Sequence, residues 1–231
     1  MNDEASDRMF DADVVEATVD FLAALAGDGR ALELGVGTGR IAIPLAARGV
    51  PVHGIDLSTE AIAELRAKRG GEGIGITIGD FSTVRVEGSF RLVYLPYNTI
   101  MNLTTQAGQV ACFRNVALHL EPGGCFVVEC VLPDLQRLPP GERFVVFDAS
   151  EHHWGVDEYD LVNQRLVSHH FDVRGDEVRK SSGPFRYAWP AEFDLMAQLA
   201  GLELRERWSG WRREPFTADS RKHVSVWQKP A

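Results

Sequence analysis

The stretch Ala31-Leu-Glu-Leu-Gly-Val-Gly-Thr-Gly-Arg40 decides how this chain folds. Its apolar run carries one acid, Glu33, and then passes through three glycines at alternating positions, Gly35, Gly37 and Gly39. Glycine lets a chain turn sharply off a strand while its bare backbone stays open to a ligand. The apolar residues that follow have helical spacing, and we expect their helix to direct unpaired N–H groups at that ligand. The stretch therefore predicts a nucleotide-type pocket at the first strand–helix junction of an α/β sheet.

The spacing of these glycines differs from that of dinucleotide-binding proteins. A dinucleotide fingerprint reads G-x-G-x-x-G, and its third glycine opens the helix that holds a pyrophosphate. Here the pattern is G-x-G-x-G, and Arg40 stands where the fingerprint has that glycine. Glu33 is also unexpected beside a pyrophosphate and suits a ligand that carries a cation and hydroxyls. A nicotinamide-dependent reductase is therefore the alternative that these two residues disfavour.

The composition is that of an ordinary globular protein. The 231 residues suffice for one large domain with a buried core, and 45% of them are hydrophobic. The net charge of -9 argues against a nucleic-acid substrate. No apolar run approaches the roughly 20 residues that span a bilayer, and the acidic N-terminus lacks the order of a signal peptide. The three cysteines have no paired metal spacing, so we expect reduced thiols in a cytoplasmic protein.

Strands alternate with helices along the first half of the chain. Short buried-type strands are predicted at 30–35, 52–56, 74–78, 90–95 and 125–132, and helices at 11–26, 39–48, after Ser58, and 105–120. This alternation indicates a Rossmann-like, doubly wound parallel sheet. The ranges 202–208 and 223–228 follow each other without a helix, so we expect an antiparallel last strand that completes seven strands.

The alternation of strands and helices stops in the middle of the chain. Strand-forming residues gather at 143–147, 161–173 and 177–187. Residues 172–177 are typical of a hairpin turn. We interpret 133–189 as a small antiparallel β insertion after the fifth strand. Residues 1–231 then form a single domain in which this insertion covers the substrate site.

Polar side chains follow the predicted strands at the point where each strand ends. Asp56 ends the second strand about twenty residues after the glycines, where an acid can take both hydroxyls of a ribose. Asp80 ends the third, and its carboxylate can accept an adenine amino group while Phe81 or Leu57 packs on the ring. The fourth strand ends in Leu95-Pro-Tyr-Asn98. All these residues lie at the carboxyl edge of the sheet, where open α/β sheets bind ligands.

Taken together, these segments resemble the class I S-adenosylmethionine-dependent methyltransferases. The segments similar to the family's successive motifs are Glu33–Gly39, Gly54–Ser58, Gly79–Phe81, Leu92–Asn98 and Leu120–Gly124. The resemblance covers about residues 10–230 and implies S-adenosyl-L-methionine as the cofactor. It implies that Glu33 and the glycines hold the methionine part, Asp56 the ribose and Asp80 the adenine. The implied cofactor-binding set is Glu33, Gly35, Gly37, Thr38, Gly39, Asp56, Leu57, Asp80, Phe81 and Leu95.

The same resemblance implies transfer of a methyl group to N or O of a small molecule. Tyr97 and Asn98 follow the fourth strand and should border the methyl group. His152 and His169 complete the candidate catalytic set, His152 in the first loop of the insertion and His169 on one of its strands. Adjacent histidines on a strand point to opposite faces, so at most one of His169 and His170 faces the pocket. Histidines without a fixed ligand spacing are a weak metal signal, and no metal is expected.

The expected partner is a small-molecule methyl acceptor, with no nucleic acid and no membrane, and a homodimer is left open. A non-catalytic S-adenosylmethionine-binding protein is a further alternative, which turnover in a substrate screen would exclude. Many small-molecule members carry a lid helix before the first core helix. Here only Met1–Phe10 precede that helix, so Phe10 is the remaining lid candidate.

Overall fold

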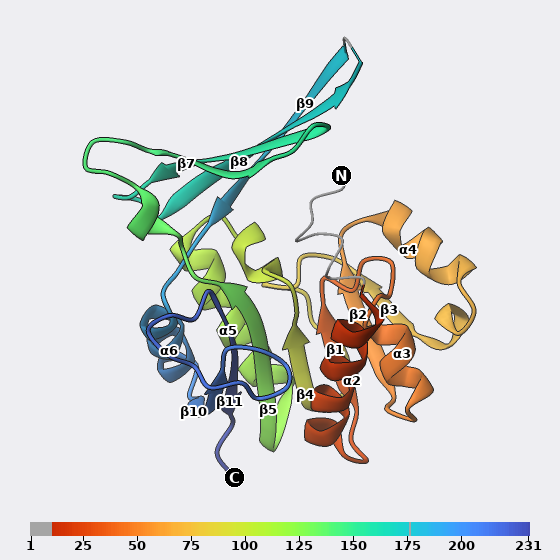
Figure 1. The fold of residues 1–231 in the computed structure, drawn as a ribbon. Coiled ribbons are helices and arrows are strands. Elements are labelled where there is room, and N and C mark those ends of the chain that lie inside the picture. Colours follow the sequence, from red (N-terminus) through yellow and green to blue (C-terminus); the bar gives the residue numbers. More distant parts are fainter. Residues whose placement is uncertain (1–10, 176) are drawn as a thin grey trace.

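A seven-stranded sheet forms the centre of the molecule, and a four-stranded antiparallel sheet stands above one of its edges (Figure 1). The structure is a computed structural model that describes residues 11–175 and 177–231. The large sheet has the order β10-β11-β5-β4-β1-β2-β3, and β11 alone runs antiparallel to its neighbours β5 and β10. Its strands are β1 Ala31–Leu34, β2 Val52–Asp56, β3 Gly75–Ile78, β4 Phe90–Leu95, β5 Leu120–Val131, β10 Glu203–Trp208 and β11 Lys222–Gln228. The predicted fold class is confirmed.

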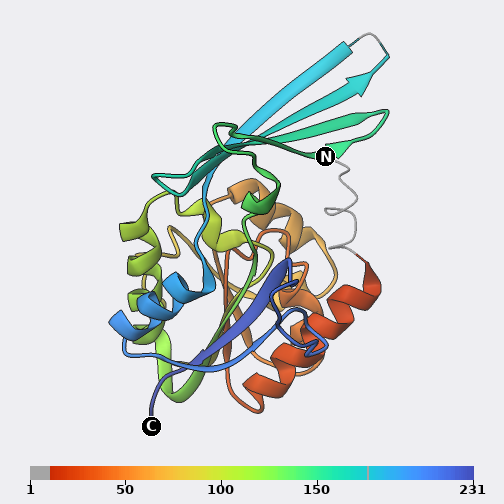
Figure 2. The same ribbon diagram turned by 60° about the vertical axis from the view of Figure 1, so that its left-hand side comes forward.

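Helices cover both faces of the large sheet (Figures 1 and 2). One face packs against α2 Ala12–Ala26, α3 Ala42–Ala47 and α4 Thr59–Ala67. The other packs against α5 Gln106–His119 and α6 Pro190–Leu199. Ser58 caps α4, because its Oγ accepts a hydrogen bond from Ala61 N–H at 3.1 Å. No helix within the described ranges is long and apolar enough to cross a membrane.

The order of the strands reverses at β1: β2 and β3 follow on one side of it, and β4 and β5 follow on the other. This strand pairs with β2 on one side and with β4 on the other, both in parallel register. The segments that leave β1 and β4 therefore diverge, and a crevice forms between them at the carboxyl ends of the strands. The glycine loop follows β1 and Tyr97 follows β4, so the topology brings these two parts of the sequence together.

The small sheet overhangs the carboxyl edge of the large one, and the hairpin of its last two strands projects beyond it (Figure 2). Its strands, in spatial order, are β6 Phe144–Ala149, β7 His153–Asp160, β8 Arg165–Arg174 and β9 Glu177–Arg186. Alternate residues of these strands face the large sheet. Among them Val145, Tyr159 and Leu166 are buried, and together with Tyr187, which follows β9, they join the core on the α5 side. The small sheet is thus packed onto the domain through apolar contacts.

Three predicted boundaries are corrected by the structure. Residues 153–160 form β7, where the sequence predicted a loop, because their three acids masked the strand pattern. Residues 161–164 are a turn and not the start of a strand. The helix after the glycine loop begins at Ala42 and not at Gly39, since Gly39 has φ +79°, which an α-helix excludes. Phe10, the lid candidate, lies outside the described residues.

Candidate active site

The glycine loop encloses a hollow between β1 and β4. Gly35, Gly37 and Gly39 all have positive φ angles, of 72°, 53° and 79°. A Cβ added at Gly35 would stand 2.6 Å from Thr99 Cγ2, whereas one at Gly37 would meet nothing within 4 Å. Gly35 is therefore needed for packing, and Gly37 leaves its backbone bare beside open space. The hollow measures about 180 Å³ and is lined by Glu33, Gly35, Val36, Gly37, Thr38, Arg40, Pro96, Tyr97 and Thr99.

Glu33 is the buried acid of this hollow. Its side chain is 2% exposed, and its Oε2 accepts a hydrogen bond from Tyr94 Oη at 2.8 Å. Burial raises the pKa of Glu33 to about 8, although the Tyr94 hydrogen bond and the charge of Arg40 act in the opposite direction. A cation placed in the hollow favours the ionised carboxylate, so this residue selects for a positively charged ligand group.

Asp56 holds the loop from the end of β2. Its Oδ2 accepts a hydrogen bond from Gly37 N–H at 2.6 Å, and its Oδ1 accepts one from Ser58 N–H at 2.8 Å. An ionised carboxylate has about four acceptor positions, so two remain for hydroxyl donors. Leu57 follows with 68% of its surface exposed at the same strand end. The structure therefore brings Asp56 and Leu57 next to the glycine loop, as the sequence predicted.

Asp80 and Phe81 differ in how far they can reach a ligand. Asp80 is exposed beyond β3, and its Oδ1 accepts a hydrogen bond from Ser82 N–H at 2.8 Å. Phe81 is 8% exposed and packs in the core, where its carbonyl accepts a hydrogen bond from Asn115 Nδ2 at 2.9 Å. Of the two apolar residues expected at the adenine, Leu57 is accessible and Phe81 is largely buried.

Tyr97 and Asn98 adopt a strained backbone at the end of β4. Their φ angles are 51° and 61°, values that are uncommon for residues other than glycine. Hydrogen bonds from β5 hold this conformation: Tyr97 N–H donates to Glu129 Oε2 at 3.0 Å, and Asn98 Oδ1 accepts from Val131 N–H at 2.7 Å. Leu95, at the last position of β4, is fully buried. This bend of the backbone places Tyr97 at the crevice.

A second cavity, of about 310 Å³, lies between this bend and the inner face of the small sheet. It is lined by Tyr97, Asn98, Met101, Val131, Leu132, Pro133, Phe147, Asp157, Tyr159, Leu166, Ser168, His170, Phe185 and Tyr187. Tyr97 lines both this cavity and the hollow of the glycine loop. The two spaces therefore meet at one side chain.

The histidines of the small sheet are placed differently from the prediction. His170 lines the cavity, whereas His169 points to the other face, with its Nδ1 2.8 Å from Ser182 Oγ and its Nε2 3.5 Å from Glu158. His152 is exposed and is not among the residues that line the cavity. The expected placement of His169 at the pocket is corrected because strand parity turns His170, and not His169, toward the large sheet. That of His152 is corrected because this residue lies exposed in the bend before β7.

Sequence reasoning missed most of the small sheet's contribution to the cavity. Asp157 and Tyr159 alternate on β7, Ser168 and His170 on β8, and Phe185 follows on β9. The signal that identifies them is this period of two, which becomes readable once β7 is recognised as a strand. Phe147 is aimed inward by an irregularity between Val146 and Asp148.

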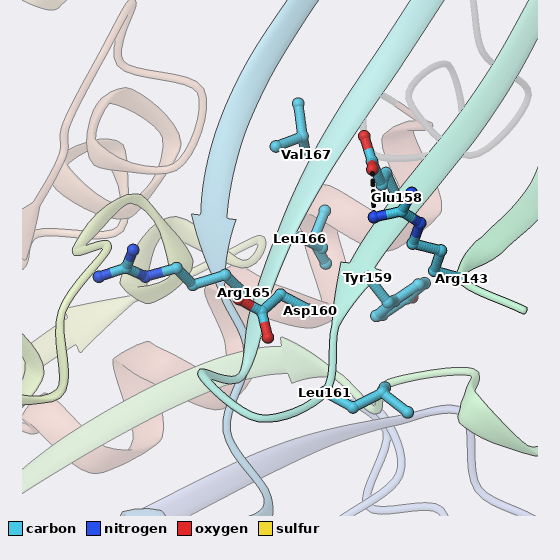
Figure 3. Close-up of a pocket in the computed structure, with 8 residues that line it drawn as sticks. All are labelled: Arg143, Glu158, Tyr159, Asp160, Leu161, Arg165, Leu166 and Val167. Carbon is cyan, nitrogen blue, oxygen red and sulfur yellow. Dashed lines mark ion pairs between the residues drawn. The ribbon is translucent and has the colours of Figure 1, made fainter. Parts of the chain in front are cut away.

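A further hollow, of about 500 Å³, lies at the turn between β7 and β8 (Figure 3). It shares Tyr159 and Leu166 with the cavity described above. Arg143 is paired with Glu158 at 3.7 Å on one side of it, and Arg165 extends away from this pair (Figure 3). No residue of the glycine loop lines it, so this hollow is not a cofactor site. Within the described ranges no group of three or more His, Cys, Asp or Glu side chains is arranged to hold a metal ion.

A similar solved structure decides the family. The CcbJ methyltransferase from Streptomyces caelestis is 39% identical, with 94% of this chain and 90% of that one covered and a TM-score of 0.85. The chain belongs to the class I S-adenosylmethionine-dependent methyltransferases. The family model for a methyltransferase domain matches residues 31–124 of this methyltransferase. The cypemycin N-terminal methyltransferase of a Streptomyces species is 29% identical over 206 residues, which are 87% of this chain and 84% of that protein.

More distant methyltransferases share the fold. The S-adenosylmethionine-bound CalS10, an amino pentose methyltransferase from Micromonospora echinaspora, is 22% identical. It covers 98% of this chain, which in turn covers 95% of it, and the TM-score is 0.72. The reductase alternative finds no support among these relatives.

The residues of the glycine loop fit S-adenosyl-L-methionine, the cofactor of these methyltransferases. The bare backbone at Gly37 leaves room for a ligand, and buried Glu33 meets a cationic group. The carboxylate of Asp56 stands at the next strand end, within reach of the same crevice. When bound, the cofactor supplies a methyl group that is already electrophilic. The chain's own task is to hold an acceptor in line with that methyl group and to exclude water.

Proposed function

We propose that this methyltransferase transfers the methyl group to the amine nitrogen of a small molecule bound under the four-stranded sheet. The observation that carries the proposal is the position of Tyr97, which lines both the glycine-loop hollow and the second cavity. An acceptor in the cavity can therefore approach the methionine end of the cofactor past one side chain. Tyr97 and Asn98 then border the transferred methyl group.

The composition of the cavity favours an amine over an alcohol. Its wall contains the aromatic rings of Tyr97, Phe147, Tyr159 and Tyr187, which attract cations through their faces. One carboxylate, that of Asp157, lies among these rings and can pair with an ammonium group. Burial, with the charge of Asp157 as a second cause, raises the pKa of Tyr159, so this phenol stays neutral. The names of two relatives, an N-terminal and an amino pentose methyltransferase, also point to amine acceptors.

The proposal extends to the contacts of the cofactor. Glu33, the glycines and Thr38 hold the methionine part of the cofactor, and Asp56 takes the ribose hydroxyls. Asp80 takes the adenine amino group, with Leu57 on the ring. The β-rich segment 133–189 covers the acceptor and keeps the reacting atoms dry.

The partner classes follow from charge and cysteine chemistry. The net charge of -9 favours a small acceptor over a nucleic acid. The three cysteines, Cys112, Cys125 and Cys130, are buried free thiols, which suits a reducing cytoplasm. A homodimer is compatible with the exposed outer face of the small sheet, which carries Trp154 and Val178.

Two matched panels of compounds test the proposal. One holds primary and secondary amines small enough for a cavity of about 310 Å³, for example phenethylamine, and the other holds the same carbon skeletons with a hydroxyl in place of the amine. Formation of S-adenosylhomocysteine is measured for both. We expect turnover in the amine panel alone. Turnover confined to the alcohols, or none in either panel, contradicts the proposal.

A further inference from the structure

Three side chains of the small sheet form a hydrogen-bonded chain that ends at the acceptor cavity. His153 is 3% exposed, and its Nδ1 lies 2.5 Å from Asp148 Oδ2. On its other side, His153 Nε2 lies 3.0 Å from His170 Nδ1. His170 Nε2 then lies 3.3 Å from Ser168 Oγ, and both His170 and Ser168 line the cavity. The chain thus runs from the carboxylate of Asp148 through the imidazoles of His153 and His170 to the cavity.

The carboxylate at one end fixes the tautomer of both rings. An ionised Asp148 only accepts hydrogen bonds, so His153 Nδ1 carries the proton and donates it. The Nε2 of a neutral His153 is then an acceptor, and His170 must donate to it from Nδ1. The Nε2 of a neutral His170 is therefore left as a lone pair, which can accept from Ser168 Oγ–H or from a bound molecule. We assign these protons from the pattern of donors and acceptors.

We propose that His170 accepts a proton from the acceptor's ammonium group, and that Asp148 and His153 are positioning residues that keep its Nε2 unprotonated. The inference rests on the proposed function, because only an amine acceptor arrives as a cation that must lose a proton. An ammonium has no lone pair, so it cannot attack the methyl group before that loss.

The proposed step balances in atoms and charge. The N–H bond of the acceptor's ammonium breaks, its electron pair stays on nitrogen, and the proton binds His170 Nε2 to give an imidazolium. The neutral amine then forms an N–CH₃ bond as the S–CH₃ bond breaks, and the positive charge moves from sulfur to nitrogen. His170 returns its proton to water when the products leave.

The surroundings of His170 favour this acceptance. The titratable or charged groups on the same face of the small sheet and along the cavity are Asp148, His153, Asp157, Asp172, Arg174, Glu177, Arg179, Tyr97, Tyr159 and Tyr187. Four of the six groups that carry a formal charge at neutral pH are carboxylates. An imidazolium formed at His170 therefore has more anionic than cationic side chains on its face of the sheet. The chain also lets the charge be shared with His153, directly beside Asp148.

A nitrogen-detected NMR experiment tests the tautomers without any acceptor. The full-length protein, labelled with ¹⁵N-histidine and bound to S-adenosylhomocysteine, reports which ring nitrogens carry protons. We expect the Nδ1–H tautomer for both His153 and His170 when the two rings are neutral, and a mixture of tautomers in Asp148→Asn. A His170 that carries its proton on Nε2 in the wild-type protein overturns the proposal.

Kinetics test the proton transfer, with an amine found in the panel above as the acceptor. In His170→Gln we expect kcat near pH 7 to fall on the order of 10²-fold or more, with unchanged affinity for S-adenosylhomocysteine. The loss should shrink as the pH rises, because solution then supplies the neutral amine. Asp148→Asn should lose on the order of 10-fold. His169→Gln is the matched control, since its ring lies on the other face, and it should keep wild-type kinetics.

The outcomes separate this inference from the proposed function. Turnover of amines with a His170→Gln rate within about twofold of wild type, or with an unaltered pH profile, overturns the role of His170 and leaves amine methylation standing. If no amine turns over, both proposals fall, because His170 then has no ammonium proton to take. The NMR spectrum still decides in that case whether the hydrogen-bonded chain exists.

Discussion

Glu129 Oε2 accepts a hydrogen bond from the backbone N–H of Tyr97 at 3.0 Å, and this bond joins β5 to the residue that borders both hollows. The other carboxylate oxygen of Glu129 pairs with Lys222 Nζ at 2.9 Å. Glu129 is itself 7% exposed. A buried acid on one strand thereby stabilises an uncommon backbone angle on the next.

Replacement of Glu129 by alanine should loosen Tyr97. The strained φ of Tyr97 then lacks its hydrogen bond, and the misplacement of a positioning group costs on the order of 10- to 100-fold in kcat. We expect kcat to fall while the affinity for S-adenosylhomocysteine changes little, because Glu129 does not line the cofactor hollow. Lys222→Met is the control, since it removes the ion pair and keeps the bond to Tyr97. A control that is as impaired as Glu129→Ala would assign the effect to charge pairing instead.

Removal of the Asp56 carboxylate should weaken cofactor binding. Asp56→Ala loses the charged acceptor that we propose for the ribose and also the bond to Gly37 N–H. We expect a cost of about 1–3 kcal/mol in the binding of S-adenosylhomocysteine, measured by calorimetry. Asp56→Asn keeps one acceptor oxygen and should lose less. Equal affinity of the wild-type protein and Asp56→Ala would refute the ribose assignment.

Cofactor binding should release a proton from Glu33. Burial raises the pKa of Glu33 to about 8, so the carboxyl is mostly protonated at pH 7, and a bound cation drives its ionisation. Calorimetry in two buffers of different ionisation heat should therefore show proton release near pH 7 and tighter binding as the pH rises toward 8. Both effects should vanish in Glu33→Gln, which cannot ionise. Binding without any proton exchange in the wild-type protein would contradict the assignment.

The same raised pKa predicts how the stability of the ligand-free protein depends on pH. Between pH 4.5 and about 8 the folded state keeps the Glu33 proton that the unfolded chain has lost. The folded state binds more protons in this window, so its stability falls as the pH rises, by up to about 1.4 kcal/mol per pH unit. Chemical denaturation at several pH values should show this contribution in the wild-type protein and not in Glu33→Gln.

A methyl group at Gly155 should disturb the acceptor cavity alone. Its Cβ would stand 2.1 Å from a ring carbon of Phe147, so the ring must leave its place in the cavity wall. We expect Gly155→Ala to raise the KM for the acceptor several-fold with unchanged cofactor affinity. Gly183→Ala is the matched control on the same sheet, because its nearest side-chain contact, Phe185, lies at 3.5 Å. Equal kinetics of the two variants would contradict the placement of Phe147.

The cofactor half of the site could be predicted because its signals are local. The run from Ala31 to Arg40 contains a strand, a bend and the buried acid within ten residues, and each glycine has a conformational reason. Asp56 and Asp80 follow apolar runs short enough to be recognised as buried strands. Their grouping then follows from parallel topology, which aligns all carboxyl ends at one edge.

The acceptor half could not be predicted because it depends on register between distant strands. The strand β7 contains Asp157, Glu158 and Asp160, so its composition is that of a loop, although Tyr159 is buried. His169 and His170 are adjacent on a strand, so the sequence predicts that they point to opposite faces. Only the pairing of β8 with its neighbours shows that His170 is the one that faces the cavity. The contact between Asp148 and His153 likewise depends on the irregularity in β6.

The order of the strands in the large sheet has a consequence for biosynthesis. The neighbour of β5 on its outer side is β11, which leaves the ribosome after every other strand of that sheet. Until then β5 is an unpaired apolar edge, open to association with other nascent chains. Glu129 also lacks Lys222 during this interval. Catalysis must therefore wait for the synthesis of β11, and truncation before residue 222 should yield an insoluble product.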